Sequence, residues 1–240
     1  VAGNTVLGES ALDAAVSGTN NTAIGRESAT TLTTGHSNTS VGSQSLQLNT
    51  TGDFNVALGK DALRYFAADS NTAVGADALQ GVSGSSTGSN NTAVGRSALT
   101  ANTTGTNNVG VGSGSLIANT TGSSNTGLGR ATLNANTTAA DNTAVGNFAL
   151  AVNTTGKRNT ALGSLALDAN TEADNNTGIG YKSLTANTSG ANNSALGSEA
   201  LDVNTTGSSN TGIGKSALGG NTTGDFNTAV GHGALLSSTT

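Results

Sequence analysis

The chain lacks several residue types that globular enzymes use. It contains no Cys, Pro, Met or Trp, and its only aromatic residues are four Phe and two Tyr among 240 residues. Without Cys there can be no disulfide and no thiolate metal site. So few large side chains cannot fill a thick hydrophobic core. The composition therefore argues against a compact enzyme domain.

Charge and long apolar segments are also scarce. Charged residues make up 10% of the chain and the formal net charge is −5, so no basic surface for nucleic acid is expected. No run of 18 apolar residues occurs, which argues against membrane insertion. Gly, Asn, Thr, Ser and Ala dominate instead. Such a bias can indicate disorder, but here the net charge is low and the apolar residues recur at fixed intervals.

What the chain has in abundance is a single repeat. A 17-residue unit with the consensus N-T-A-V-G-x-x-A-L-x-x-N-T-T-G-x-x occurs fourteen times, and Asn91–Asn107 is a clean copy. Every interval is 17 residues except for two adjacent intervals of 16 and 20 residues. The units begin at Asn4, Asn21, Asn38, Asn55, Asn71, Asn91, Asn108, Asn125, Asn142, Asn159, Asn176, Asn193, Asn210 and Asn227.

The length of the unit predicts the fold class. Seventeen residues are too few for a helical repeat, but they suit one β-coil of two or three short strands joined by tight turns. The N-T-T-G segment supplies Asn and Gly for such turns. We therefore expect an all-β fold, a parallel β-solenoid or β-roll with 17-residue coils. It should form one array over residues 1–240 without separate caps, interrupted by an irregular insertion near residues 65–89.

Particular repeat positions carry structural demands. Position five is Gly in all fourteen copies, which indicates a positive φ or close approach of another backbone. Position four is always Val, Ile or Leu, and position nine is Leu in thirteen copies. Position one is always Asn and position twelve is usually Asn, so stacked amides are predicted to form ladders between coils. In two representative copies the predicted structural residues are Asn91, Val94, Gly95, Leu99 and Asn102, and Asn142, Val145, Gly146, Leu150 and Asn153.

The charged residues follow the same pattern. All but two of the 23 fall at positions six, seven, ten, sixteen and seventeen, and none falls at positions one to five, eight or nine. An unpaired charge is costly where water is excluded. Positions six, seven, ten, sixteen and seventeen are therefore predicted to face water, and the charge-free positions to face an interior or an interface.

The energetics of one coil favour association of chains. Full burial of each of its two large aliphatic side chains contributes about 1.5–3 kcal/mol. Ordering the backbone costs on the order of 1–2 kcal/mol per residue. Burial between chains would help to close this gap, which favours a homotrimer in which positions four and nine are divided between the coil interior and a central axis. The alternative is a single-chain left-handed β-helix, because V-G-x-x-A-L partly matches a hexapeptide pattern.

The motif N-T-A-V-G-x-x-A-L followed by N-T-T-G also carries a family resemblance. It resembles the repeat tract of bacterial and phage tail-fibre-domain proteins and the head of YadA-type trimeric autotransporter adhesins, whose repeats read approximately N-S-x-A-I-G-x-x-S. The similarity extends from Asn4 to Leu235, although the unit here is longer than the adhesin repeat. The resemblance implies a left-handed trimeric β-roll that projects from a cell surface or a virion.

No catalytic, cofactor-binding or metal-binding residues are predicted. The two histidines, His36 and His232, lie at variable positions, and the carboxylates are dispersed. The sequence does contain repeated N-x-[ST] sequons, which are candidate glycosylation sites but also arise from turn and ladder residues. At position twelve they are Asn49, Asn102, Asn119, Asn136, Asn153, Asn187, Asn204 and Asn221, and at the unit boundary Asn20, Asn90, Asn175 and Asn192.

These observations predict an extracellular structural fibre or filament segment with a display or adhesion role. The alternatives are an ice-binding single-chain β-solenoid, because Thr recurs regularly, and a passive scaffold of a phage tail fibre. The expected partners are the chain itself, as a homotrimer and in end-to-end filaments, and a cell-surface or glycan receptor. Aromatics such as Phe54 and Phe226 are expected either to be exposed contacts or to cover gaps between coils, and the irregular stretch near residues 65–89 is the expected distinct surface.

Overall fold

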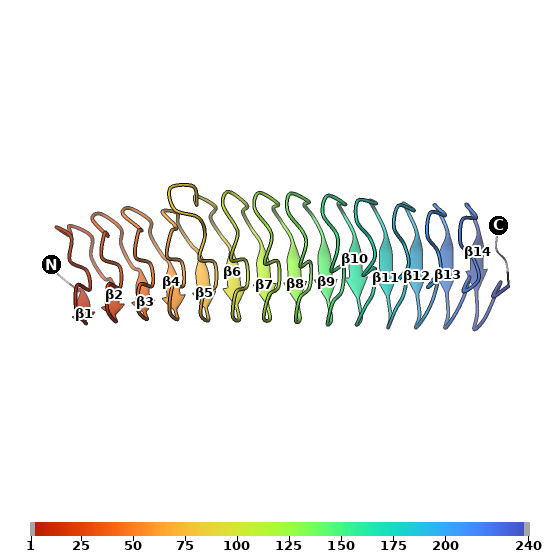
Figure 1. The fold of residues 1–240 in the computed structure, drawn as a ribbon, viewed down its shortest axis with the longest axis horizontal. Coiled ribbons are helices and arrows are strands. Elements are labelled where there is room, and N and C mark those ends of the chain that lie inside the picture. Colours follow the sequence, from red (N-terminus) through yellow and green to blue (C-terminus); the bar gives the residue numbers. More distant parts are fainter. Residues whose placement is uncertain (1–2, 238–240) are drawn as a thin grey trace. The chain divides into compact units, whose positions relative to one another are not determined.

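The computed structural model describes residues 3–237 and divides into two compact units, residues 1–123 and 124–240. Each unit is a stack of coils that contribute one short strand apiece (Figure 1). The 17-residue spacing continues across the boundary, from Asn108 to Asn125, so the repeat itself gives no indication of the division.

Within each unit, every strand pairs in parallel with the next strand of the chain. Equivalent repeat positions lie opposite one another, as in the pairing of Thr22 with Thr39 in the first unit and of Thr160 with Thr177 in the second. In the first unit the strands are β1 Thr5–Leu7, β2 Thr22–Ile24, β3 Thr39–Val41, β4 Val56–Leu58, β5 Thr72–Val74, β6 Thr92–Val94 and β7 Val109–Val111. In the second they are β8 Thr126–Leu128, β9 Thr143–Val145, β10 Thr160–Leu162, β11 Thr177–Ile179, β12 Ser194–Leu196, β13 Thr211–Ile213 and β14 Thr228–Val230.

The prediction of an all-β parallel β-solenoid with coils of about 17 residues is confirmed. The expectation of two or three strands per coil is wrong, because each coil has one. The reason is the backbone after the strand. In the copy that begins at Asn91, φ is +126° at Gly95, +57° at Ser97 and +53° at Leu99. These left-handed residues alternate with ordinary ones and turn the chain sharply, so extended structure cannot continue.

The core of most coils is narrow and contains one large side chain, whereas the coil that begins at Asn55 buries both Leu63 and Phe66. Leu99 and Leu150, at position nine, are fully buried, and the neighbouring positions three and eight hold small residues that are also buried in most coils. The one copy without Leu at position nine has Ala29, which is buried as well. There Leu32, at position twelve, is fully buried and supplies the missing aliphatic volume.

Both predicted asparagine ladders are present. At position one, the backbone N–H of Asn108 donates to the Oδ1 of Asn91 one coil earlier over 3.0 Å. The Nδ2 of Asn108 also donates to the carbonyl of Gly122 at the end of its own coil over 2.8 Å. At position twelve, the Nδ2 of Asn187 donates to the Oδ1 of Asn170 over 3.0 Å. All of these asparagines are fully buried, so the ladders satisfy polar groups that water cannot reach.

We predict that the position-twelve ladder contributes measurably to stability. The Asn187 side chain makes three hydrogen bonds: to Asn170, to the Gly190 carbonyl over 2.9 Å, and from Asn204 over 2.9 Å. Replacement of Asn187 by Ala should destabilise the second unit by about 2–3 kcal/mol, because buried partners are left unpaired. Urea denaturation followed by circular dichroism measures the loss.

Asn49 is the matched control for this prediction. It occupies the same repeat position, but Leu32 precedes it and Phe66 follows it one coil away, so no ladder forms. Its Nδ2 has no hydrogen-bond partner, and only its Oδ1 is used, by the Gly52 N–H over 2.7 Å. Asn49→Ala should therefore cost clearly less than Asn187→Ala. Equal losses would show that the ladder adds nothing beyond side-chain volume.

Candidate interaction surface

The alternation of side chains along each strand creates a distinct outer face. In β10 the middle residue Ala161 is fully buried in the coil, whereas Leu162 is 45% exposed and Thr160 is half-buried. Successive strand residues point to opposite sides of a sheet. Repeat positions two and four therefore point outward, and position three points into the core.

Position four forms a continuous row of outward-facing aliphatic side chains on each unit, which we call the aliphatic row. The strands are in register, so these side chains stack from coil to coil. The most exposed members, Leu7 and Val230, are each 68% exposed, and the predicted structural residues Val94 and Val145 are half-buried members. In the first unit the row is Leu7, Ile24, Val41, Leu58, Val74, Val94 and Val111; in the second it is Leu128, Val145, Leu162, Ile179, Leu196, Ile213 and Val230.

This geometry separates the two aliphatic positions. Position nine lies inside the coil, where Leu99 and Leu150 are buried, and position four lies on the surface of the single chain. Position two, which is Thr in eleven copies, runs beside the aliphatic row on the same face. Since positions one to five carry no charge, the outer face of each unit is a charge-free strip of aliphatic and hydroxyl side chains. Large exposed apolar patches of this kind mark interaction surfaces.

The charged residues lie elsewhere on the coil, with one departure from the prediction. Position seven was expected to face water, but Asp61 is only 3% exposed. Its carboxylate is paired with Lys60 over 2.9 Å and with Arg64 over 3.2 Å, which compensates for its burial. The bond to Asp61 raises the pKa of Lys60, and partial burial raises the pKa of Asp202. None of these groups lies on the outer face of the strands.

The candidate glycosylation sites divide into two groups. The position-twelve asparagines are fully buried and, except for Asn49, their amides are used in the ladder or in bonds within the coil. A glycan on Nδ2 would have no room in the folded chain, so burial favours the reading as turn and ladder residues for Asn49, Asn102, Asn119, Asn136, Asn153, Asn187, Asn204 and Asn221. The boundary asparagines Asn20, Asn90, Asn175 and Asn192 are exposed.

Two exposed phenylalanines occupy the same turn in the two units. Phe54 is 63% exposed and Phe226 is 81% exposed, so they are surface side chains and not covers for gaps between coils. An Asp precedes each of them, and its carboxylate accepts the backbone N–H of a residue one coil earlier. The donor is His36 in the first unit and Ser208 in the second, each over 2.6 Å. The identical segment T-T-G-D-F-N produces both turns. The repeat pattern alone missed this recurrence because it lies at variable positions.

Groups suited to metal binding are not gathered on the part of the chain that the structure describes. Over residues 3–237 there is no cluster of three or more His, Asp or Glu side chains that could hold a metal ion. The ring Nδ1 of His36 accepts the backbone N–H of Thr19 over 3.0 Å, and His232 lies on the surface. No helix in the same range is long and apolar enough to cross a membrane.

Comparison of the chain with protein-family models and with curated proteins finds no match.

Proposed function

We propose that this chain is a segment of an extracellular structural fibre, in which three copies associate through their outer sheet faces. The observation that supports the proposal is the aliphatic row, which is exposed on the single chain and free of charge along each unit. A short repeat whose coils stack on one another can build a long and rigid segment of fibre. The charged and variable positions then remain free to face solvent, for display on a cell surface or a virion.

The energy available from this row is substantial. A side chain such as Leu162 that is about half exposed gains on the order of 1 kcal/mol when it is covered. Several members of each row are less exposed than Leu162, so the seven residues of one unit together supply on the order of a few kcal/mol for each chain. This is comparable with the lower estimates of the cost of losing translational and rotational freedom. Three chains that pack around one axis would cover these rows together. The same stacking principle would also permit end-to-end filaments.

A charge placed on the aliphatic row should separate the chains. We expect the wild-type chain to sediment and scatter light at about three times 23.1 kDa. The double variant Leu162→Asp, Leu196→Asp should shift to the single-chain mass, because a buried carboxylate without a partner is strongly unfavourable at a contact between chains.

Leu165 in the same coil provides the control. It lies at position seven, where Asp occurs naturally in other copies, so Leu165→Asp should leave the assembly intact. A wild-type chain that is already a single copy would overturn the trimer. Assembly that survives the double variant would show that the chains meet elsewhere.

The row of threonines supports a second candidate, an ice-binding surface. These side chains repeat in register on the outer face, with Val56, Val109 and Ser194 as the exceptions. An ice-binding face must stay exposed, whereas a trimer covers the same strands. Thermal hysteresis in a single-chain sample would favour this candidate, and a trimer without hysteresis would favour the fibre. A passive scaffold would have the same assembly but no ligand.

A further inference from the structure

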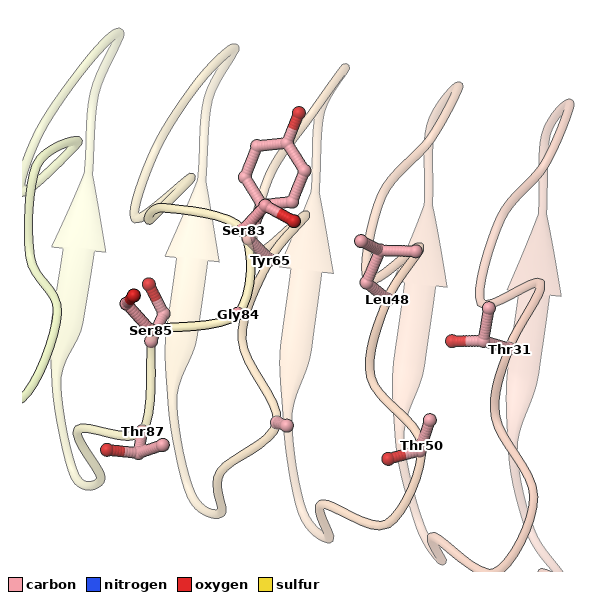
Figure 2. A pocket seen from close by; sticks show the side chains of 10 residues that line it. Thr31, Leu48, Thr50, Tyr65, Ser83, Gly84, Ser85 and Thr87 are labelled. Atoms are coloured by element: carbon pink, nitrogen blue, oxygen red, sulfur yellow. The ribbon is translucent and has the colours of Figure 1, made fainter.

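The irregular stretch of the first unit creates a pocket. The 20-residue copy that begins at Asn71 keeps its strand in register with β4 and β6, so its extra residues lie outside the sheet. They form a loop over residues 82–87, which stands against the preceding coils (Figure 2). The cavity between them has a volume of about 420 Å³, which is within the range of small-ligand sites.

The loop is a fixed wall of this pocket. The Oγ of the buried Ser86 accepts the Val82 N–H over 2.8 Å, which closes the loop on itself. The Ala67 N–H donates to the Ser86 carbonyl over 3.2 Å, and the Thr87 N–H donates to the Thr103 carbonyl over 2.8 Å. The loop is thus tied both to the coil before it and to the coil after it.

The facing side of the pocket comes from position eleven of three successive coils. In most copies this position holds a small residue, but here it holds Thr31, Leu48 and Tyr65 in turn. The half-buried Tyr65 ring lies 5.0 Å from the guanidinium carbon of Arg64, measured to the ring centroid. The Nε of Arg64 donates to the Oε1 of Gln47 over 2.9 Å, so the cation beside the ring is itself held by the preceding coil.

The chemistry of the lining is neutral and rich in hydroxyls. None of the residues that line the pocket is charged. Within the described part of the chain, the hydroxyls of Thr50, Ser83, Ser85 and Thr87 make no hydrogen bond to another protein group, and all four residues are exposed. A ligand for this pocket should therefore offer an apolar face to Leu48 and Tyr65 and hydroxyls to the loop.

We propose that this pocket binds a neutral sugar residue, such as a hexose at the end of a glycan. One face of a pyranose ring presents C–H groups, which pack on an aromatic ring through its negative face, while the equatorial hydroxyls can exchange hydrogen bonds with Ser and Thr. The absence of charge disfavours phosphate, carboxylate or ammonium ligands.

The proposal deepens the display role proposed above, because it gives the fibre a chemical class of receptor. It does not depend on the trimer, since every lining residue belongs to one unit of one chain. No residue of the aliphatic row lines the pocket. Association of chains through the row would therefore leave the pocket residues uncovered.

Binding can be tested with neutral gluco-, galacto- and manno-oligosaccharides and with acidic oligosaccharides, immobilised on an array and then titrated free in solution by calorimetry. We expect at least one neutral series to bind. Tyr65→Ala should weaken that binding about tenfold, because the ring supplies the stacking surface. Ala67→Gln, at an exposed lining residue, should weaken it similarly by occupying the cavity without removing a contact.

Tyr181→Ala is the matched control. Tyr181 is also a surface tyrosine with a cation over its ring, Lys182 at 5.4 Å, but it lies in the other unit and lines no part of this pocket. Binding that survives both pocket variants, or binding of acidic sugars alone, would overturn the proposal, as would no binding at all. Light scattering on the same samples keeps the outcomes separate: a trimer that binds no neutral sugar rejects only the pocket, and a single chain that binds one rejects only the fibre assembly.

Discussion

Replacement of Gly146 by Ala should destabilise the second unit by about 4 kcal/mol or more. Gly146 has a φ of +130°, a region that side-chain-bearing residues rarely adopt. A Cβ at this residue would also lie 2.6 Å from the backbone carbonyl carbon and oxygen of Gly163 in the next coil. Both atoms are backbone, so no side chain can move aside. The loss would appear as a lower urea midpoint in circular dichroism.

Gly114 provides the control for this effect. It also has a positive φ, +67°, but a Cβ there would meet nothing within 4 Å. Other copies place ordinary residues at the same repeat position, such as Phe148 with a φ of +55°. Gly114→Ala should therefore change stability by no more than about 1 kcal/mol. Similar losses for the two variants would mean that contact between coils does not explain why position five is always Gly.

Replacement of Leu167 by Ala should cost about 2–5 kcal/mol, because it empties most of the core of one coil. Leu167 is fully buried at position nine and is flanked by small residues such as Ala166. No other large aliphatic side chain of its own coil is buried, so collapse around the cavity would be limited. Thermal or urea denaturation of the variant measures the loss.

Leu165 in the same coil is the comparison. It has nearly the same left-handed backbone, with a φ of +60° against +52° for Leu167, so backbone propensities cancel between the two variants. Leu165 lies at position seven and is only half-buried. Leu165→Ala should cost about 1 kcal/mol or less. If both variants lost the same stability, the position-nine column would not be the core of the coil.

Much of the fold could be predicted because the same residue types are required at the same positions of each coil. Fourteen copies of Gly at position five indicated a special backbone, and Gly95 and Gly146 have it. Asn at positions one and twelve indicated ladders, and both ladders form. The left-handed conformation at positions seven and nine could not be predicted, because Leu at position nine and most residues at position seven, such as Ser97 and Phe148, carry no local preference for positive φ. The stacking of the coils imposes it.

Some side-chain contacts and the pocket were less predictable. The burial of Asp61 depends on the side chains of Lys60 and Arg64, and the pocket beside Tyr65 depends on a loop from a later copy. The irregular spacing pointed to the correct stretch, near residues 65–89, but not to a cavity or its lining. The sequons at position twelve do not by themselves indicate glycosylation, because Asn and Thr have structural reasons to occur together in this repeat.

By itself, the sequence determined the length of the coil, the β class, the demand for Gly at position five and the exclusion of charge from positions one to five. These follow from period and composition, which act locally in every copy. Only the tertiary structure decided which aliphatic position is core and which is surface. Charge is absent from positions four and nine alike, so the sequence could not distinguish them. The strand turns Ala161 inward and Leu162 outward, and the turn after it brings Leu167 back inside.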